Sequence, residues 1–218
     1  MHEINLLKNY PRTKRNVAKR LIAKTPEHIK IAKQFGKVFF DGPREYGYGG
    51  YQYDGRWQPV AKDIIEHFNL QAGMKLLDIG CAKGFLIYDL MHACPGLQAY
   101  GIDISDYAIN NCLPQVANNV QIGCAENLPF ANNSFDAVIS INTIHNLSKN
   151  KCKIAIQEIE RVAPGKGYIQ VDSYFTTQQK QLFLDWVLTA EYHDTPQGWK
   201  NLFKAAGYTG YFYWTITE

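Results

Sequence analysis

Apolar and polar positions follow two alternating periods along most of the chain, and these periods predict strands and helices in turn. Almost wholly apolar runs such as 75–79 and 135–141 are typical of strands that are buried on both faces of a parallel sheet. Between such runs, apolar residues recur at every third or fourth position, which indicates one buried face of a helix. The expected strands are 75–79, 99–103, 120–123, 135–141, 167–172 and 208–216. The expected helices are 60–68, 84–94, 105–113, 149–163, 178–186 and 196–206, and residues 187–193 fit either a strand or more helix.

Strands that alternate with helices predict the α/β fold class, here a doubly wound, mostly parallel sheet with helices on both faces. Ligands of such sheets bind near the carboxyl ends of the strands. We expect the chain to have two parts. Residues 1–58 form an N-terminal extension of helices and loops, and residues 59–218 form the ligand-binding domain.

The first part of this extension is basic. Residues 1–37 contain ten Lys or Arg residues against Glu3 and Glu27. This excess is typical of a solvated helix face, and it also suits an arm that meets a phosphate-bearing partner or an acidic substrate. The spacing of Val17, Leu21 and Ile22 predicts a short amphipathic helix within it. Residues 38–58 are rich in Tyr, Gly and Pro, which argues against a regular helix there.

Composition sets bounds on the class of protein. The 218 residues are 46% hydrophobic, which is enough for a sizeable core. No apolar run approaches the ~20 residues of a membrane span, and the polar N-terminus does not read as a secretory signal. The five cysteines are scattered without a C-x-x-C pair, so we expect reduced thiols, no metal site and a cytoplasmic protein.

A tight turn after the strand at 75–79 carries the most specific chemical signal. Asp78 stands at the end of the strand, and Gly80 and Gly84 follow in the spacing Asp-x-Gly-x-x-x-Gly. Dinucleotide sites have Gly-x-Gly-x-x-Gly instead, and an acid at the start of the loop would repel their pyrophosphate. Such an acid suits a cationic amino group. Because Asp103, at the end of the next strand, can accept both hydroxyls of a ribose, a ligand with an amine at one end and a ribose further along is expected, and S-adenosylmethionine fits this description.

Four motifs in order resemble those of the class I S-adenosylmethionine-dependent methyltransferases, near the broad small-molecule group often called type 11. They are 76–85, 101–105, 125–130 followed by 134–138, and 161–167. The resemblance covers residues 58–172. It implies a Rossmann-like sheet of seven strands, an S-adenosylmethionine-binding methyltransferase domain over 59–218, and S-adenosylhomocysteine as the product.

The resemblance also implies which residues hold the cofactor. They are Asp78, Gly80, Cys81, Ala82 and Gly84 around the amino acid end, Asp103 and Ile104 at the ribose, Ala125 and Glu126 by the adenine, and Asn142 at the rim. Cys124 is a departure, because related sequences commonly carry Asp there and a thiol is a poor acceptor for an amino group. Glu126, a backbone carbonyl or packing must then replace it. A helix also separates the last two expected strands, which leaves their order in the sheet open.

His145 follows the strand at 135–141, at the rim where the transferred methyl group should lie. Imidazole titrates near neutral pH, so His145 is a candidate catalytic base for an oxygen or nitrogen nucleophile. It can equally be a wall of the pocket, because methyl transfer from a sulfonium often needs little beyond alignment. The sequence leaves both roles open.

Candidate substrate-binding residues come from the loop at 44–57 and from the last third of the chain. Arginines in that loop could clamp a carboxylate or phosphate, and its tyrosines could stack on a flat or polyhydroxylated molecule, or the loop could simply pack over the sheet. The predicted set is Arg44, Tyr46, Tyr48, Arg56, Tyr174 and His193. Our hypothesis is that this loop closes the active site, with Arg56 near the cofactor carboxylate or the substrate.

Together these features predict an enzyme that methylates an oxygen or nitrogen of a small polar metabolite, with a sugar or surface-polysaccharide precursor as one option. One alternative is an RNA or protein methyltransferase whose basic arm grips phosphates. Another is a cofactor-binding partner subunit without catalysis. The arm carries no recognisable nucleic-acid module, so we expect a small-molecule substrate rather than nucleic acid, and no membrane partner. The oligomeric state, a homodimer included, stays open.

Overall fold

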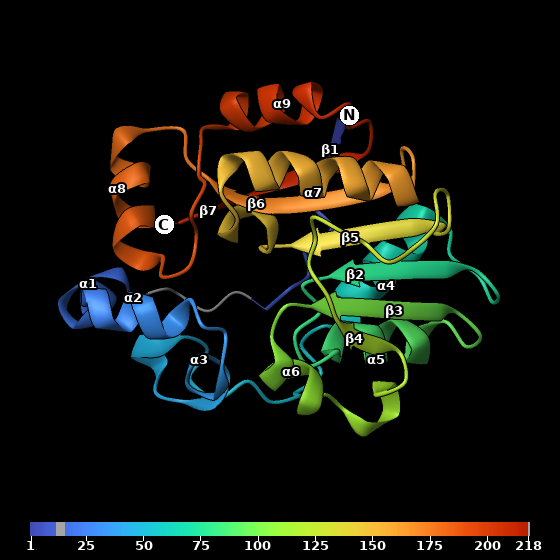
Figure 1. Cartoon of the computed structure of the whole chain (residues 1–218), viewed down its shortest axis with the longest axis horizontal. Helices are drawn as coiled ribbons and strands as arrows, with labels where there is room; N and C mark the ends of the chain where they lie inside the picture. The colour runs from blue at the N-terminus through green and yellow to red at the C-terminus, as the bar shows by residue number, and fades with distance from the viewer. Residues whose placement is uncertain (12–15, 218) are drawn as a thin grey trace.

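The computed structural model describes residues 1–11 and 16–217. These residues form one parallel sheet of seven strands with helices around it. The strands are β1 (His2–Glu3), β2 (Lys75–Ile79), β3 (Gln98–Asp103), β4 (Val120–Ile122), β5 (Ala137–Ile141), β6 (Gly167–Ser173) and β7 (Tyr211–Ile216). Their order across the sheet is β1-β7-β6-β5-β2-β3-β4, and each pairing is parallel. This arrangement confirms the predicted Rossmann-like, doubly wound fold (Figure 1).

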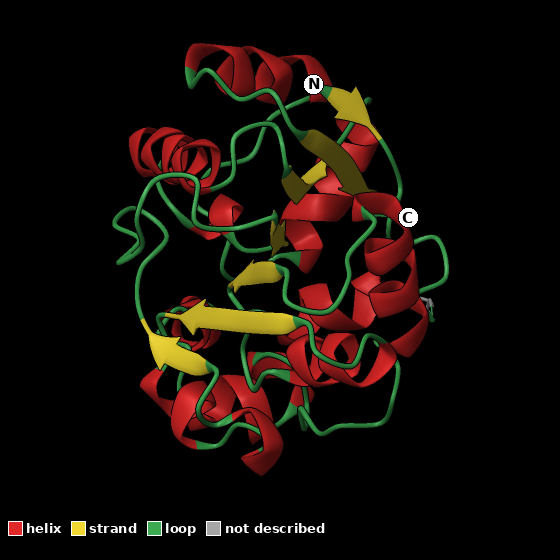
Figure 2. Ribbon diagram, turned by 90° about the vertical axis from the view of Figure 1, so that its right-hand side faces the viewer, coloured by secondary structure: helices red, strands yellow, loops and turns green. Residues whose placement is uncertain are grey.

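Nine α-helices lie in the described part of the chain. They are α1 (Val17–Ala23), α2 (Pro26–Ala32), α3 (Lys37–Asp41), α4 (Gln58–Phe68), α5 (Phe85–Ala93), α6 (Asp106–Asn110), α7 (Lys149–Val162), α8 (Thr177–Trp186) and α9 (Pro196–Ala205). Helices α7 and α9 cover one face of the sheet and α4 and α5 the other (Figures 1 and 2). None of the helices described here has both the length and the apolar character needed to cross a membrane.

Two hydrophobic cores lie between the sheet and these helices. Successive side chains of a strand point to opposite faces, so Leu76 packs towards α4 and α5 whereas Leu77 packs towards α7 and α9. Ile64 of α4 is fully buried in the first core, and Trp199 of α9 is fully buried in the second. Because both faces of the strands are covered, both faces must be apolar, which explains the near-continuous apolar runs in the sequence.

The predicted strands and most predicted helices are confirmed, with boundaries that shift by a few residues. The clearest difference is at 187–193, which forms neither the strand nor the helix that the sequence allowed. Its backbone is held by tertiary contacts instead, because the N–H groups of Glu191 and Tyr192 both donate to the carbonyl of His145, at 2.9 and 3.1 Å. The loop therefore lies against the residue that follows β5.

The edge strand β1 comes from the N-terminal extension, where the sequence pattern gave no sign of it. His2 pairs with Tyr211 and Glu3 with Phe212 of β7. A strand of two residues is too short to show a period, so no hydrophobic pattern could reveal it. It covers the backbone groups along part of an otherwise open edge of the sheet.

The predicted helix near residue 20 is present as α1, but it buries a different side. Arg20 is only 8% exposed, whereas Leu21 and Ile22 are 49% and 87% exposed, so the expected apolar face is wrong. The reason is the contact of Arg20 with Trp186, at the end of α8. Other basic residues of the arm, Arg12, Lys14 and Arg15, lie outside the described residues.

The expectation that no helix forms over 38–58 is also partly wrong. Helix α3 covers Lys37–Asp41, and a 3-10 helix covers Arg44–Tyr46. Both are short, and α3 ends where the backbone turns at Gly42. Aromatic contacts stabilise these short elements, since Phe39 and Phe40 of α3 both pack against the ring of Tyr48.

Candidate functional site

A cavity of about 1450 Å³ lies at the carboxyl ends of β2, β3, β5, β6 and β7. Its other walls come from α1, α3, the loop at 44–57 and the end of α8. Ligand pockets for one small molecule usually occupy about 300–1,000 Å³. The cavity therefore has room for a nucleoside-sized cofactor together with a second small molecule.

The turn after β2 forms one wall of this cavity. Gly80 has a φ of +83°, and a Cβ at this position would collide with the side chain of Thr143, so only glycine fits. The N–H groups of Gly80 and Cys81 donate to the carbonyl of Ile102, at 2.8 and 3.1 Å, which ties the turn to β3. Gly84 closes the turn, with a φ of +73°, as the residue before α5.

Asp78 is the last acid of β2 and lies against the cavity with its side chain buried, at 5% exposure. Among the residues that the structure describes, we find no group that donates a hydrogen bond to its carboxylate. Burial, and secondarily the charge of Asp103, raise the pKa of Asp78 to about 8. A cationic ligand group beside Asp78 would favour the ionised carboxylate and relieve this cost.

Asp103, at the end of β3, is held in place by two backbone donors. The N–H of Ser105 donates to Oδ1 and the N–H of Ala82 donates to Oδ2, both at 2.8 Å. Burial raises the pKa of Asp103, and these hydrogen bonds act in the opposite direction. Each carboxylate oxygen keeps a further lone pair, so Asp103 can still accept the hydroxyl groups of a ligand.

A third acid, Glu126, follows β4 and also lines the cavity. Its Oε1 forms an ion pair with Lys151 at 3.1 Å, whereas its Oε2 is buried without a hydrogen-bond partner in the described residues. Buried carboxylate oxygens normally have a donor, so this atom suits an N–H of a ligand. Cys124 lies in the same wall. Glu126 thus offers the acceptor that a thiol at Cys124 cannot provide.

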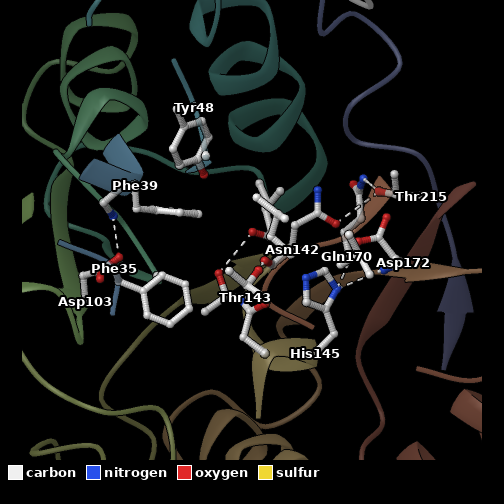
Figure 3. A pocket seen from close by; sticks show the side chains of 18 of the residues that line it. Phe35, Phe39, Tyr48, Asp103, Asn142, Thr143, His145, Gln170, Asp172 and Thr215 are labelled. Carbon is white, nitrogen blue, oxygen red and sulfur yellow. Dashed lines mark hydrogen bonds and ion pairs between the residues drawn. The ribbon is translucent and has the colours of Figure 1, made fainter. Parts of the chain in front are cut away.

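A cluster of polar side chains lies at the other side of the cavity, around His145 (Figure 3). His145 is 4% exposed, and its Nδ1 accepts a hydrogen bond from the N–H of Asp172 at 3.2 Å. Gln170 donates to Thr215 at 2.7 Å, and Thr215 donates to Asn142 at 3.2 Å. These hydrogen bonds connect the ends of β5, β6 and β7 into one polar surface.

Asp172 also sets which nitrogen of His145 carries the proton. The hydrogen bond from the backbone N–H of Asp172 to Nδ1 requires an unprotonated Nδ1. In the neutral ring the proton is then on Nε2. The carboxylate Oδ2 of Asp172 lies 3.4 Å from the same Nδ1 and can accept an N–H from it in the other tautomer, or in the imidazolium. The backbone contact is the shorter of the two and its donor always carries its hydrogen, so the resting neutral ring carries its proton on Nε2.

The structure brings most of the predicted site residues together. The cavity is lined by Asp78, Gly80, Cys81, Ala82, Asp103, Ile104, Ala125, Glu126, Asn142 and His145, and by Arg44, Tyr48 and Arg56. Figure 3 shows Phe35, Phe39 and Tyr48 near Asp103, and His145, Gln170 and Asp172 at the opposite side. Within the loop, the guanidinium of Arg56 is already paired with Asp54, with Nε to Oδ1 at 2.8 Å.

Four predicted residues do not line the cavity, contrary to expectation. Gly84 packs closely against the side chain of Val116, and a Cβ at this position would lie 2.7 Å from it. Tyr46 packs against His28, with ring centroids 4.5 Å apart. Tyr174 and His193 bond to each other, from hydroxyl to Nδ1, at 3.0 Å. The side chains of Tyr46, Tyr174 and His193 thus contact neighbours within the protein, and the binding roles suggested for these four residues stay predictions.

Other cavity residues were not predicted from the sequence. Asp172 could have been found, since it ends an expected strand just as Asp78 and Asp103 do. Arg20 and Trp186 give no such signal, because only the packing of α1 against α8 brings them to the cavity.

The model of a methyltransferase domain family matches residues 77–171, which span β2 to β6 and include Asp78, Asp103 and His145. Residues 77–171 belong to the class I S-adenosylmethionine-dependent methyltransferases. The cofactor of this family is S-adenosylmethionine. Three features fit a ligand of this chemistry: the buried carboxylate of Asp78, the close approach at Gly80, and Oε2 of Glu126, which has no hydrogen-bond partner among the described residues.

Curated relatives of this methyltransferase domain are named for different substrates. The chain is 32% identical to a tRNA (carboxymethyluridine(34)-5-O)-methyltransferase of Arabidopsis thaliana, over 63% of this chain and 33% of that protein. It is 27% identical to a demethylmenaquinone methyltransferase of Symbiobacterium thermophilum, over 55% of this chain and 50% of that protein. The chain thus spans between one third and one half of the length of these two relatives.

A solved structure of similar fold contains a methyltransferase bound to the Trm112 methyltransferase activator of Haloferax volcanii. It aligns with a TM-score of 0.55 at 20% identity, over 71% of this chain and 73% of that chain. At this identity the likeness shows the methyltransferase fold alone.

Proposed function

We propose that this protein transfers a methyl group from S-adenosylmethionine to an oxygen or nitrogen atom of a small polar molecule bound in the same cavity. The observation that carries the proposal is the carboxylate of Asp78, which is buried at the cavity without a hydrogen-bond donor among the described residues. Such an arrangement is unfavourable in the protein alone and becomes favourable when a ligand supplies a cation. The amino group of the cofactor is such a cation.

The chain's own residues then divide the work of holding the cofactor. Asp78 would bind the amino group, Asp103 the ribose hydroxyls, and Oε2 of Glu126 the exocyclic amino group of the adenine. The cofactor supplies an electrophilic methyl group on a sulfonium. Gly80 lets the backbone of the turn approach the ligand, since any side chain there would meet Thr143.

His145 is the proposed base on the acceptor side. To act as a base, the ring must first shift from its resting tautomer to the one with the proton on Nδ1, in which the carboxylate of Asp172 accepts a hydrogen bond from Nδ1–H and Nε2 is unprotonated. A proton taken up by Nε2 then gives an imidazolium next to a carboxylate, which Asp172 stabilises. Gln170, Thr215 and Asn142 add hydrogen-bonding groups that suit a polar acceptor, including a polyhydroxylated one.

A second candidate is methylation of tRNA, which the names of two relatives favour. Besides the Arabidopsis protein, a human probable tRNA methyltransferase 9B is 30% identical over 58% of this chain. Against this candidate, several basic residues of the arm are engaged within the chain. Lys24 donates to the carbonyl of Leu184, and Lys33 pairs with Glu191.

Calorimetry and label transfer test the proposal together. We expect S-adenosylhomocysteine to bind and NAD not to bind, with weaker binding in an Asp103→Asn variant. With methyl-labelled S-adenosylmethionine, label should enter the small-molecule fraction of a cell extract and not purified total tRNA. Binding of NAD alone would refute the cofactor assignment, and label in tRNA with a steep salt dependence would favour the second candidate.

A further inference from the structure

Two arginines and a tryptophan meet on the wall of the cavity. Arg20 comes from α1, Arg44 from the 3-10 helix Arg44–Tyr46, and Trp186 from the end of α8. The guanidinium carbons lie 4.7 Å (Arg20) and 5.5 Å (Arg44) from the centre of the Trp186 ring. All three side chains line the cavity. A flat ring thus positions two cations at one place on the cavity wall.

The charge of Arg20 is poorly compensated by the residues that the structure describes. Its side chain is 8% exposed, and Nη1 donates to the backbone carbonyl of Glu45 at 3.0 Å. No carboxylate of the described residues forms an ion pair with it within 4.0 Å. Burial, followed by the charge of Arg44, lowers the pKa of Arg20 to about 10, while the charge of Glu45 acts in the opposite direction. Burying a cation beside another cation is costly unless an anion completes the group.

Arg56, which also lines the cavity, behaves differently. Arg56 already binds the carboxylate of Asp54 through Nε, at 2.8 Å to both oxygens. Its charge is therefore satisfied within its own loop. The contrast between a paired Arg56 and an Arg20 bonded to a carbonyl indicates that Arg20, rather than Arg56, is available to an anion in the cavity.

We propose that Arg20 and Arg44 form an oxyanion subsite, so that the molecule methylated by this protein carries a phosphate or carboxylate group. This inference rests on the proposed function. Planar guanidinium groups match both oxyanions through paired N–H donors, and Trp186 restricts their orientation. The anion would lie towards α1 and α8, and the rest of the acceptor would extend towards His145 and Asp172.

The test is a titration with inorganic phosphate, and separately with acetate, followed through the indole N–H signal of Trp186 in two-dimensional NMR spectra. The protein is first saturated with S-adenosylhomocysteine. We expect saturable shifts with phosphate and a dissociation constant that rises about 10-fold or more in Arg20→Gln and in Arg44→Gln, since each loses a charged hydrogen bond. Arg56→Gln is the matched control, with a change of less than about twofold.

Acetate competing as well as phosphate would point to a carboxylate acceptor, and phosphate binding alone to a phosphorylated one.

The outcomes separate this inference from the proposed function. Equal phosphate binding in the wild type and Arg20→Gln, or equal losses in Arg20→Gln and Arg56→Gln, would overturn the subsite while leaving the cofactor assignment intact. Phosphate binding that depends on Arg20 in a protein that does not bind S-adenosylhomocysteine would refute the proposed function and keep the subsite. Unchanged S-adenosylhomocysteine affinity in Arg20→Gln shows that the variant is folded, and Arg44→Gln provides the second test if it is not.

Discussion

At the scale of single residues, Asp78 shows how a site can reduce the stability of the protein that carries it. The carboxylate is buried at the end of β2 and its pKa is raised to about 8, first by burial and then by Asp103. Between pH 4 and pH 8 the unfolded chain has released this proton and the folded chain keeps it. Stability therefore falls as the pH rises through this window.

Replacing this carboxylate should stabilise the protein and weaken its ligand binding. We expect Asp78→Asn to raise the free energy of unfolding at pH 8 by up to about 5 kcal/mol, since the pKa is raised from 3.8 to about 8 and one pKa unit corresponds to about 1.4 kcal/mol. The gain should be much smaller at pH 5, where the folded wild type is protonated. Urea unfolding at both pH values measures it, and an equal gain at pH 5 and pH 8 would contradict the raised pKa.

The same carboxylate should make cofactor affinity depend on pH. Calorimetry with S-adenosylhomocysteine should show tighter binding to the wild type as the pH rises from 6 to 8.5, because Asp78 must ionise to bind the amino group. At pH 8.5 the Asp78→Asn variant should bind about 10–100-fold more weakly, the loss of a charged hydrogen bond. It should also lose most of this pH dependence. A variant with the same pH profile as the wild type would place the dependence elsewhere.

At the scale of elements, Lys83 joins the turn after β2 to α3. Its side chain is nearly buried, and Nζ donates to both carboxylate oxygens of Asp41, at 2.8 and 2.7 Å, and to the carbonyl of Tyr51, at 3.0 Å. Tyr107 of α6 also donates to Asp41, at 2.6 Å. This cluster holds the N-terminal segment over the cavity, so Lys83 acts through structure and not through chemistry.

Breaking the cluster should loosen the segment that covers the cavity. We expect Asp41→Asn to lower the free energy of unfolding by about 2 kcal/mol, because it leaves a buried ammonium without its partner. Burial acts to raise the pKa of Asp41, but the hydrogen bonds from Lys83, Tyr107 and Tyr51 keep it below its ordinary value. The difference between wild type and variant should therefore vanish as the pH falls through that lowered pKa.

Urea unfolding and limited proteolysis within residues 42–56 measure this effect. The matched control is Asp54→Asn, which removes the exposed pair with Arg56 and should cost less than about 1 kcal/mol. Similar losses in the two variants would mean that the Lys83 cluster is no more important than a surface ion pair.

At the scale of the whole molecule, the cavity lies between two parts of the chain that differ in how they are held. The sheet is fixed by fully buried cores on both faces. The segment with α1 to α3 is attached through smaller contacts, including Lys83 with Asp41 and Lys24 with Leu184. A ligand in the cavity touches both parts and should strengthen the weaker one.

Hydrogen exchange should show this strengthening directly. With S-adenosylhomocysteine at 100 times its dissociation constant, stability should rise by about 2.7 kcal/mol, and protection should increase in α3 and in residues 47–57. Backbone amides of α9, which packs on the sheet away from the segment with α1 to α3 (Figure 1), provide the internal control. Their protection should change only if they exchange by global unfolding. Protection confined to the turn after β2 would mean that the N-terminal segment does not close over the cofactor.

The amino-acid sequence by itself determined the parallel sheet and its acidic strand ends. Near-continuous apolar runs are stable only as strands that are covered on both faces. An acid at the end of such a run, as at Asp78 and Asp103, lies at the carboxyl ends of the strands, where ligands bind. The sequence could also have indicated Asp172, which is the last residue of an expected strand. These features depend on neighbours in the sequence, so local patterns reveal them.

Only the tertiary structure decided which other residues share the cavity. Arg20 meets Trp186 because α1 packs on α8, β1 completes the sheet through two residues, and Tyr174 turns to His193 instead of the cavity. Each of these contacts joins segments whose local patterns are indifferent to the pairing. Their geometry depends on how the whole chain packs, which no periodicity of apolar positions can record.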